Sequence, residues 1–362
     1  MTTTFDLQAL AGRVGISVTD RPQTVPKALQ TDPEPTPTRT HRPGSVVEMI
    51  GQEEIRVQLA MRLRAAKVRG EQPGHMLFFG PPGLGKTTLA EIVAAETGGR
   101  LVRTTASAVN SPFKIGKELA QLVDGDVIFI DEVHGLSKIT MELLYTAMED
   151  GRIEVSSGKG DRTKSISVEL KAFVLVAATT APGKLDPAFR GRFGFVASLE
   201  YYSDEALGKI IARVATKKGL DLAEGAALSL GRRSRGTPRH ALHLLERAAG
   251  YATVVADEGE DVVIDEEAVA NSLALAGIDS LGLTPDDRRF LQTLCVDHMG
   301  GPVGLANIAN SIGVDHPTVV GMIEPFLLRA GLIKRGSRGR MATPAAYGHL
   351  GLKAPVTLAW AV

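Results

Sequence analysis

Residues 80–87 read Gly-Pro-Pro-Gly-Leu-Gly-Lys-Thr, a spacing that can hold the phosphates of a nucleotide. Glycines let backbone N–H groups turn inward around the α- and β-phosphates, where side chains would clash. Lys86 can then reach the β- and γ-phosphates, and the Thr87 hydroxyl can bind Mg²⁺. An ordinary glycine-rich turn is the alternative. The surroundings favour the phosphate loop, because it follows a short apolar run, 75–79, and precedes a helix-forming run that stops at Gly98.

A second candidate group is the acidic pair Asp131 and Glu132, which ends the apolar run 127–130. Ligands of open α/β sheets lie at the carboxyl ends of the strands, so both carboxylates should fall beside the phosphate loop. Asp131 can then support the Mg²⁺ shell, and Glu132 can polarise the attacking water as a general base. Alone, such a pair is equally a solvated acidic turn. With the phosphate loop upstream, it predicts an NTPase.

Three further candidates each keep a structural alternative. The pair Thr179-Thr180 closes the predicted strand 173–178, where a hydroxyl can orient water or sense the γ-phosphate, although threonine also ends strands for packing reasons. Arg190 and Arg192, which lie among glycines and aromatic residues, are either surface charge or the source of a finger for a neighbour's γ-phosphate. Arg239 falls in the first turn after a Thr237 cap, where the helix dipole disfavours a cation by about 0.3–1 kcal/mol. A bound phosphate would explain this position, and a snorkelling arginine is the alternative.

The elements that must position these residues form an α/β core followed by helices. Apolar runs predict the strands of a parallel sheet, with a hairpin at 153–170 before the fourth. From Ser203 the pattern becomes helical, with Ser203 and Asp265 as N-caps and Gly219 and Gly277 as stops. The predicted strands are 75–79, 101–105, 126–132, 173–178 and 196–200, and the predicted later helices are 204–217, 222–233, 238–255 and 265–276.

A small third domain begins near Thr284. A helix at 285–294 precedes a helix-turn-helix pattern, 305–312 and 316–330, and then a basic hairpin, 332–342. The pattern predicts a winged helix whose wing contacts DNA phosphates, with protein docking as the alternative. The fold class is therefore α/β, a P-loop core with a parallel sheet, an all-helical lid and a C-terminal winged helix. The cations of the wing, with no acid among them, are Lys334, Arg335, Arg338 and Arg340.

Composition narrows the class of protein. A chain of 362 residues suffices for two or three domains. Its 41 basic residues equal its 41 acidic ones, so any nucleic-acid surface must be local. The single Cys295 excludes an intramolecular disulfide framework and a cysteine-built zinc site, and it fits a reducing compartment. No apolar run approaches the roughly 20 residues of a membrane span, and no secretory signal opens the chain. We therefore expect a cytoplasmic protein without membrane contact.

Taken together, the motifs resemble those of the RuvB family, the hexameric AAA+ motors of Holliday-junction branch migration. The resemblance runs from about Arg42 to Leu352 in family order. It implies an ATP-dependent DNA translocase or helicase that works as a hexameric ring on a four-way junction or duplex DNA. The matching motifs are GPPGLGKTTLA, FIDEVHGLS, AMED, ATT, RGRFG, RRSRGTPR, GGPVGL and RGRMATP.

The resemblance also implies roles for single residues. Glu132 would activate water, Thr180 would be sensor 1, Arg192 the finger acting in trans, and Arg239 sensor 2. DNA contacts would come chiefly from Arg335 and Arg340, with Lys334 and Arg338 beside them. The residues implied to hold ATP and Mg²⁺ are Arg42, Gly83, Gly85, Lys86, Thr87, Thr88, Asp131, Tyr202, Arg239 and the acidic pair Glu149-Asp150 near the subunit boundary.

In the family, the hairpin that corresponds to 153–170 docks on RuvA, the junction-binding partner. Here Ser156 and Ser157 stand where apolar residues are usual, whereas Ile166 and Val168 are kept. The hairpin therefore predicts a RuvA-like partner but leaves its identity open.

Two other functions fit the same motifs. One is an AAA+ loader or remodeller of another protein ring, whose winged helix contacts protein. The other is a DNA-binding switch whose ATP state only sets affinity. The predicted segments are a flexible or disordered tail 1–40, an AAA+ core 41–202, a helical lid 203–277, a winged-helix DNA-binding domain 278–352 and a tail 353–362.

Overall fold

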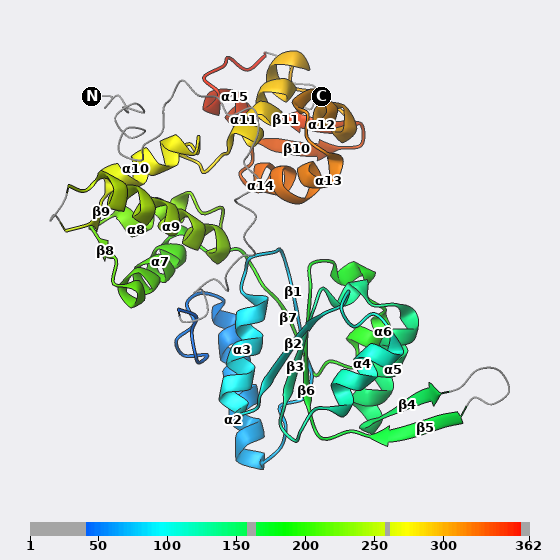
Figure 1. Ribbon diagram of the computed structural model, residues 1–362. Helices are drawn as coiled ribbons and strands as arrows, with labels where there is room; N and C mark the ends of the chain where they lie inside the picture. Colours follow the sequence, from blue (N-terminus) through cyan, green and yellow to red (C-terminus); the bar gives the residue numbers. More distant parts are fainter. Residues whose placement is uncertain (1–40, 158–163, 258–260, 356–362) are drawn as a thin grey trace, which may run out of the picture. The chain divides into compact units, whose positions relative to one another are not determined.

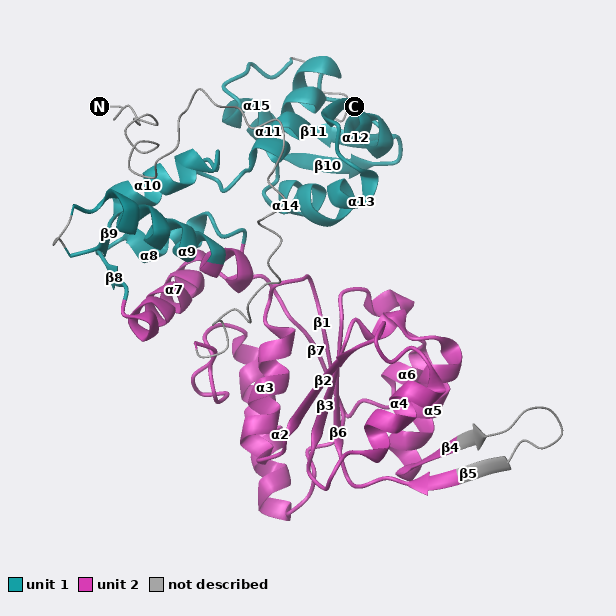
Figure 2. Ribbon diagram, viewed as in Figure 1, with its two compact units in different colours: residues 1–22, 220–235, 243–362 teal, residues 23–219, 236–242 magenta. Residues whose placement is uncertain are grey.

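The computed structural model divides the chain into two compact units (Figures 1 and 2). We call residues 41–219 with 236–242 the core unit, and residues 220–235 with 243–355 the lid–wing unit. The predicted tail 1–40 lies outside the described residues. Among the residues described, no helix combines the length and apolarity that crossing a bilayer requires. The described ranges are 41–157, 164–257 and 261–355.

The core unit contains a five-stranded parallel sheet, and each predicted strand is present. Its strands are β1 (Met76–Phe79), β2 (Leu101–Thr105), β3 (Val127–Asp131), β6 (Val174–Thr179) and β7 (Phe195–Ser198), in the order β2-β3-β6-β1-β7. One face carries α2 (Glu53–Arg69) and α3 (Lys86–Thr97), and the other carries α4 (Pro112–Ala120), α5 (Lys138–Asp150) and α6 (Pro187–Arg190) (Figure 1). The helix α7 (Asp204–Lys218) also belongs to this unit, although its residues fall within the predicted lid 203–277.

Alternation along the strands explains why both faces are covered. Met76 and Phe78 of β1 pack with the α2 and α3 side, whereas Leu77 between them packs with the α4 and α5 side. A strand buried on both faces reads as a continuous apolar run, which is why these strands could be predicted. The order β3-β6-β1 brings three carboxyl ends together. The phosphate loop, Asp131 and Thr180 therefore follow neighbouring strands.

The predicted hairpin is present as β4 (Arg152–Ser157) and β5 (Lys164–Glu169), which pair antiparallel and extend away from α5 (Figure 1). Ile153 is buried in the core at its base and pairs with Val168. The turn 158–163 and the side chains of Ser156, Ser157 and Ile166 lie outside the described part of the chain.

The lid–wing unit begins with the predicted helices. It also contains one short strand pair that the sequence did not predict. The helix predicted from residue 222 begins four residues later, because Leu222 instead pairs with Ile264 in a parallel two-residue ladder. The Asp265 cap is confirmed, since its carboxylate accepts from the Ala268 amide. The elements are β8 (Asp221–Leu222), α8 (Ala226–Arg232), α9 (Pro238–Val255, whose first residues belong to the core unit), β9 (Val263–Ile264) and α10 (Glu266–Leu275).

A winged helix follows, as predicted. Its helices are α11 (Pro285–Gln292), α12 (Leu305–Ile312), α13 (His316–Thr318), α14 (Glu324–Arg329) and α15 (Pro344–His349), and its wing is β10 (Ile333–Gly336) with β11 (Gly339–Ala342). The predicted helix 316–330 contains a π-turn at Val319–Ile323, where the Glu324 amide bonds the Val319 carbonyl. Pro325 has no amide proton and clashes with the preceding turn, which accounts for the wider turn before it.

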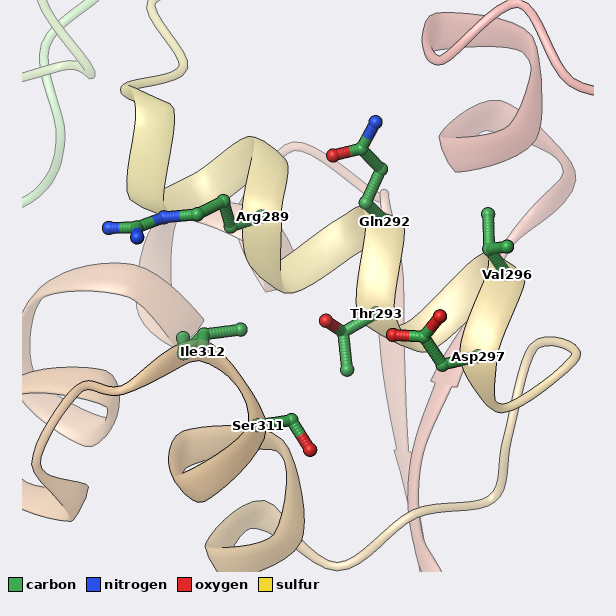
Figure 3. A pocket seen from close by; sticks show the side chains of 7 residues that line it. All are labelled: Arg289, Gln292, Thr293, Val296, Asp297, Ser311 and Ile312. Carbon is green, nitrogen blue, oxygen red and sulfur yellow. The ribbon is translucent and has the colours of Figure 1, made fainter.

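A pocket of about 330 Å³ lies in the winged helix between the end of α11 and α12 (Figure 3). Its one lining cation, Arg289, is ion-paired with Asp286. None of the residues predicted to hold nucleotide or DNA lines it. Its lining residues are Arg289, Gln292, Thr293, Val296, Asp297, Ser311 and Ile312.

His75, just before β1, contributes a pH-dependent term to the stability of the core unit. Its Nδ1 accepts a hydrogen bond from the Leu175 amide at 2.9 Å, and its ring lies 5.4 Å from that of Phe173. Burial lowers the pKa of His75, and the charge of Arg62 adds to this, while a hydrogen bond with the Met148 backbone opposes it.

A lowered pKa means that the folded state binds fewer protons than the unfolded state. His75 should therefore reduce stability as pH falls through the unfolded value of about 6.5. In His75→Asn, the amide oxygen can replace Nδ1 as acceptor but does not titrate. We expect denaturant midpoints of this variant to depend less steeply on pH between about 7.5 and 5.5 than those of the parent chain. Equal slopes would refute the assignment.

Candidate nucleotide-binding site and DNA interface

The loop between β1 and α3 has the backbone that phosphate binding requires. Gly80, Gly83 and Gly85 adopt φ values of 138°, 83° and 102°, which favour glycine. A Cβ on Gly80 would lie 2.6 Å from the Leu199 carbonyl oxygen. The N-cap of α3 is Gly85, which supplies no side-chain acceptor to the first amides of the helix. Those amides are therefore free to bind an anion at the positive end of the helix.

Lys86 lies inside this loop and is nearly fully buried. Its Nζ donates to the carbonyl oxygens of Gly80 at 2.8 Å and Pro81 at 2.9 Å. Burial lowers the pKa of Lys86, while the charges of Glu132 and Asp131 oppose that shift. The ammonium is thus close to both acids and can exchange loop carbonyls for phosphate oxygens. Thr87 and Thr88 follow Lys86 in the first turn of α3.

The acidic pair lies at the end of β3, as predicted. Asp131 Oδ1 accepts from the Glu132 amide at 2.9 Å. Glu132 has φ 50°, unusual for a residue with a side chain, and such strain recurs at functional sites. Its Oε2 accepts from the Thr180 amide at 3.2 Å and the Thr180 hydroxyl at 2.8 Å. The structure thus joins the predicted base to the predicted sensor. The Thr87 hydroxyl and the Asp131 carboxylate are oxygen groups of the kind that Mg²⁺ prefers as ligands.

Sequence reasoning gave no role to one polar neighbour of Glu132, His134. His134 Nδ1 lies 3.1 Å from Glu132 Oε2 and 2.8 Å from the hydroxyl of buried Thr179. That hydroxyl also accepts from the Ala181 amide at 3.0 Å. These contacts fix the turn after β3 to the turn after β6. The signal available in the sequence was His134 itself, two residues after the acidic pair.

The segment that enters the lid, Gly236–Leu242, reaches the phosphate loop. We call it the lid-entry segment. The Arg239 amide lies 3.4 Å from the Gly83 carbonyl oxygen, and a Cβ on Gly83 would lie 3.0 Å from the Arg239 Cβ. The Tyr202 hydroxyl donates to the Leu84 carbonyl at 3.1 Å, and the Tyr202 amide donates to the Gly236 carbonyl at 2.9 Å. Burial raises the pKa of Tyr202 to about 12, so it stays a hydrogen-bond donor. Both residues predicted to hold nucleotide from this side therefore contact the loop.

Arg42 is fixed to the helix that follows the loop. Its Nη1 lies 2.6 Å from Oε1 of Glu91 on α3, a carboxylate that also pairs with Arg103. The structure thus places Arg42 beside α3 through Glu91, a residue to which the sequence analysis gave no role.

Arg192 is held by its own chain and lies apart from the residues just described. Its Nε and Nη2 lie 3.0 Å and 3.2 Å from the Glu149 carboxylate oxygens, and Nη1 donates to the Ala188 carbonyl at 2.8 Å. The guanidinium lies 4.6 Å from the centroid of the Tyr145 ring. Among the contacts of the described residues, none joins Arg192 to residues 80–87. Glu149 therefore pairs with the predicted finger here, and Asp150 lies 3.8 Å from Arg152.

The wing carries its four predicted cations, but two of them share an acid. Glu324, fully buried on α14, accepts from Arg335 at 2.8 Å with both oxygens and from Arg340 at 2.7 and 3.2 Å. Burial alone would raise the pKa of Glu324, but the hydrogen bonds of the two arginines outweigh it and lower the pKa. Lys334 and Arg338 are exposed. The prediction of a patch without acids is therefore incomplete, because Glu324 precedes the wing in sequence but lies beneath it.

The fold and this site define a P-loop ATPase of the AAA+ class, with a lid and a winged helix. The family models that match are the Holliday junction DNA helicase RuvB P-loop domain over residues 41–199, the RuvB AAA lid domain over 202–279 and the RuvB C-terminal winged helix domain over 280–351. The chain belongs to the RuvB family.

Relatives support this membership over most of the chain. A protein of Corynebacterium aurimucosum named Holliday junction branch migration complex subunit RuvB is 46% identical over 317 residues, 88% of this chain and 87% of its own. A Mycolicibacterium smegmatis protein of the same name is 45% identical over 316 residues, 87% of this chain and 89% of its own. The solved Thermotoga maritima RuvB Holliday junction branch migration motor matches with TM-score 0.75 and 39% identity, covering 87% of this chain and 99% of that one.

The contacts of Glu132 lead to a test of its role. In Glu132→Gln, the amide can still accept from Thr180 but cannot take a proton from water. We expect ATP binding to be retained and ATP turnover to fall by about 10²–10⁴-fold. Titration with a fluorescent ATP analogue and phosphate-release kinetics measure the two effects. Glu142→Gln, an exposed carboxylate on α5, is the control. Parent-like turnover in Glu132→Gln would exclude a base role.

Proposed function

We propose that this chain is an ATP-driven DNA motor that drives branch migration of Holliday junctions. Branch migration is what the names of its relatives state of those proteins. In our proposal, the chain works as a hexameric ring with MgATP bound between subunits, and hydrolysis moves duplex DNA held by the winged helices.

The observation that carries this proposal is the contact between the phosphate loop and the lid-entry segment. The Gly83 carbonyl faces the Arg239 amide, and Tyr202 bonds both the loop and Gly236. A change in the loop on loss of the γ-phosphate would act directly on the backbone that leads into the lid. A site that only bound nucleotide would not need that connection, whereas a motor does.

Within this proposal, each residue has one role. Lys86 and the glycines of the loop hold phosphates, Thr87 and Asp131 hold Mg²⁺, and Glu132 activates water under the control of Thr180. Arg239 senses the γ-phosphate in cis. Arg192 completes the site of a neighbouring subunit. The remaining nucleotide contacts are assigned to Arg42, Thr88, Tyr202, Glu149 and Asp150, and the DNA contacts to Lys334, Arg335, Arg338 and Arg340.

We also propose the domain boundaries and a partner. The AAA+ core is 41–202, the lid 203–277 and the winged helix 278–352, with tails on either side. The hairpin β4–β5 is the proposed docking site for a RuvA-like junction-binding protein. Ile153, which pairs with Val168, anchors the base of this hairpin in the core.

The most informative experiment is ATP turnover without DNA, with linear duplex and with a four-way junction, each with and without a RuvA-type protein. A branch-migration motor should be stimulated by DNA, most by the junction with the partner. Stimulation by protein alone would favour a loader, and slow turnover insensitive to DNA would favour a switch.

The wing supplies the companion test of DNA contact. Replacing Arg335 and Arg340 alone would leave Glu324 buried and unpaired, which destabilises the domain. We therefore use the triple variant Glu324→Gln, Arg335→Gln, Arg340→Gln. We expect weaker duplex binding and a log–log salt slope lower by about two. Arg289→Ala removes a cation of the same domain and is the control. Unchanged DNA affinity in the triple variant would favour protein contact through the wing.

The separation of Arg192 from the phosphate loop predicts action between subunits. Arg192→Ala should bind ATP normally and lose about 10³-fold or more in turnover. Mixing it with Lys86→Ala should restore part of the turnover, because each chain then supplies the half-site that the other lacks. Arg190→Ala, exposed at the end of α6, should behave like the parent chain. Full turnover of Arg192→Ala alone would rule out the finger role.

A further inference from the structure

Arg235 occupies the junction between the two compact units. It is the last residue of the lid–wing unit before the lid-entry segment, which starts at Gly236. Its φ is 51°, a left-handed conformation that arginine seldom adopts and that glycine takes easily. A side chain at such a position must be held by its surroundings. The contacts of Arg235 explain what holds it.

The Arg235 side chain bonds three separate parts of the winged helix and its linker. Its Nε donates to the Gly282 carbonyl at 2.9 Å, and its Nη2 bonds Oδ2 of Asp287 on α11. Its guanidinium lies 4.6 Å from the centroid of the Phe326 ring on α14. The planar guanidinium donates hydrogen bonds along its edge and stacks with its face on an aromatic ring. It therefore fixes the orientation of these partners as well as their distance from Arg235.

The acid that receives Arg235 is itself rigidly placed. Asp287 is fully buried, and its Oδ2 accepts from the Thr284 amide and hydroxyl at 2.7 Å each, which closes the capping box of α11. The Arg235 side chain is only 12% exposed. The ion pair thus joins the start of the winged helix to residue 235 without solvent between them. Gly282 also packs closely against the turn that leads into Arg235, since a Cβ on Gly282 would lie 2.5 Å from the Arg233 carbonyl oxygen.

On the other side of Arg235, the chain reaches the phosphate loop within four residues. Gly236 is bonded by the Tyr202 amide, Thr237 caps the helix by accepting from the His240 amide, and the Arg239 amide faces Gly83. Pro238 and Arg239 are the first residues of α9, and Thr237 caps that helix, so these three residues move together. Gly236, whose carbonyl is held by the Tyr202 amide, is the one residue between the cap and Arg235, so the backbone passes a shift of Arg239 to Arg235 across a single residue.

We propose that Arg235 is a positioning residue that fixes the winged helix to the lid-entry segment, so that nucleotide-dependent movement of that segment is passed to the DNA-binding domain. This inference rests on the proposed function and names the residue that couples its two ends. Arg235 acts through Asp287 and Phe326 and touches neither nucleotide nor DNA in this assignment.

The test compares Arg235→Lys with the matched control Arg233→Lys, whose parent side chain bonds only Ser229 of its own helix among its recorded contacts. Lysine keeps the charge but loses the fork and the stacking plane. Amide hydrogen exchange of residues 282–292 is measured with and without ATPγS, alongside DNA-free turnover, DNA-stimulated turnover and duplex affinity. In Arg235→Lys, we expect the nucleotide-dependent exchange difference and the DNA stimulation each to fall by about fivefold or more. DNA-free turnover and duplex affinity should stay within about twofold of the parent chain, as should every property of Arg233→Lys.

The outcomes separate this inference from the proposed function. If the parent chain lacks DNA stimulation, the proposed function fails, and the exchange measurement still tests Arg235. If exchange at 282–292 ignores nucleotide in the parent chain, or responds equally in Arg235→Lys, the inference is wrong. Thermal melts check folding. Should Arg235→Lys unfold, the neutral pair Arg235→Gln with Asp287→Asn replaces it and must show the same selective loss. Equal loss of DNA-free turnover would reduce Arg235 to a structural role and overturn the inference.

Discussion

The structure depends on one constraint, which is that the first amides of α3 must stay unbonded within the protein. A helix start without a side-chain cap is costly unless another acceptor is supplied, and here Gly85 supplies none. The glycine conformations before it keep other side chains out of the same space. The sheet order then sets Asp131 and Glu132 on one neighbouring strand end and Thr180 on another. All of these features meet at the loop, where a bound anion would supply the acceptor that the helix start lacks.

The same loop is also a structural junction. Leu84, in its middle, is fully buried and gives its carbonyl to Tyr202, and Gly83 gives its carbonyl to Arg239. The backbone of the phosphate loop is therefore hydrogen-bonded to the Arg239 amide and to the Tyr202 side chain, whose own amide bonds Gly236. Two of these three bonds join main chain to main chain over short segments, so they leave little room for movement by side-chain rotation. That property suits a protein whose nucleotide state must be sensed at a distance.

Local signals made most of the fold and much of the site predictable. The caps at Asp186, Ser203 and Thr237 depend only on residues within one helical turn, and each is present. Buried parallel strands can be predicted from the sequence because both of their faces are apolar, which gives a continuous apolar run. Contacts between segments distant in sequence were not predictable. Glu324 lies under the wing only because the chain folds back, and a π-turn before it changes which face of the helix it occupies. The β8–β9 ladder likewise joins two-residue segments too short to show a period.

Five of the cations that we propose to bind phosphate share one arrangement that no sequence pattern reports. Lys86 rests on loop carbonyls, Arg42 on Glu91, Arg192 on Glu149, and the two wing arginines on Glu324. Each of these five cations is thus already oriented by the protein, which would reduce the entropy lost in the phosphate binding that we propose. A phosphate that bound one of these cations would replace or join the partner that the cation already has. The free energy gained would therefore be smaller than that of an ion pair formed by an unpaired cation. Modest gains at every contact would suit the proposed motor, because binding too tight to release would stop each cycle at its first step.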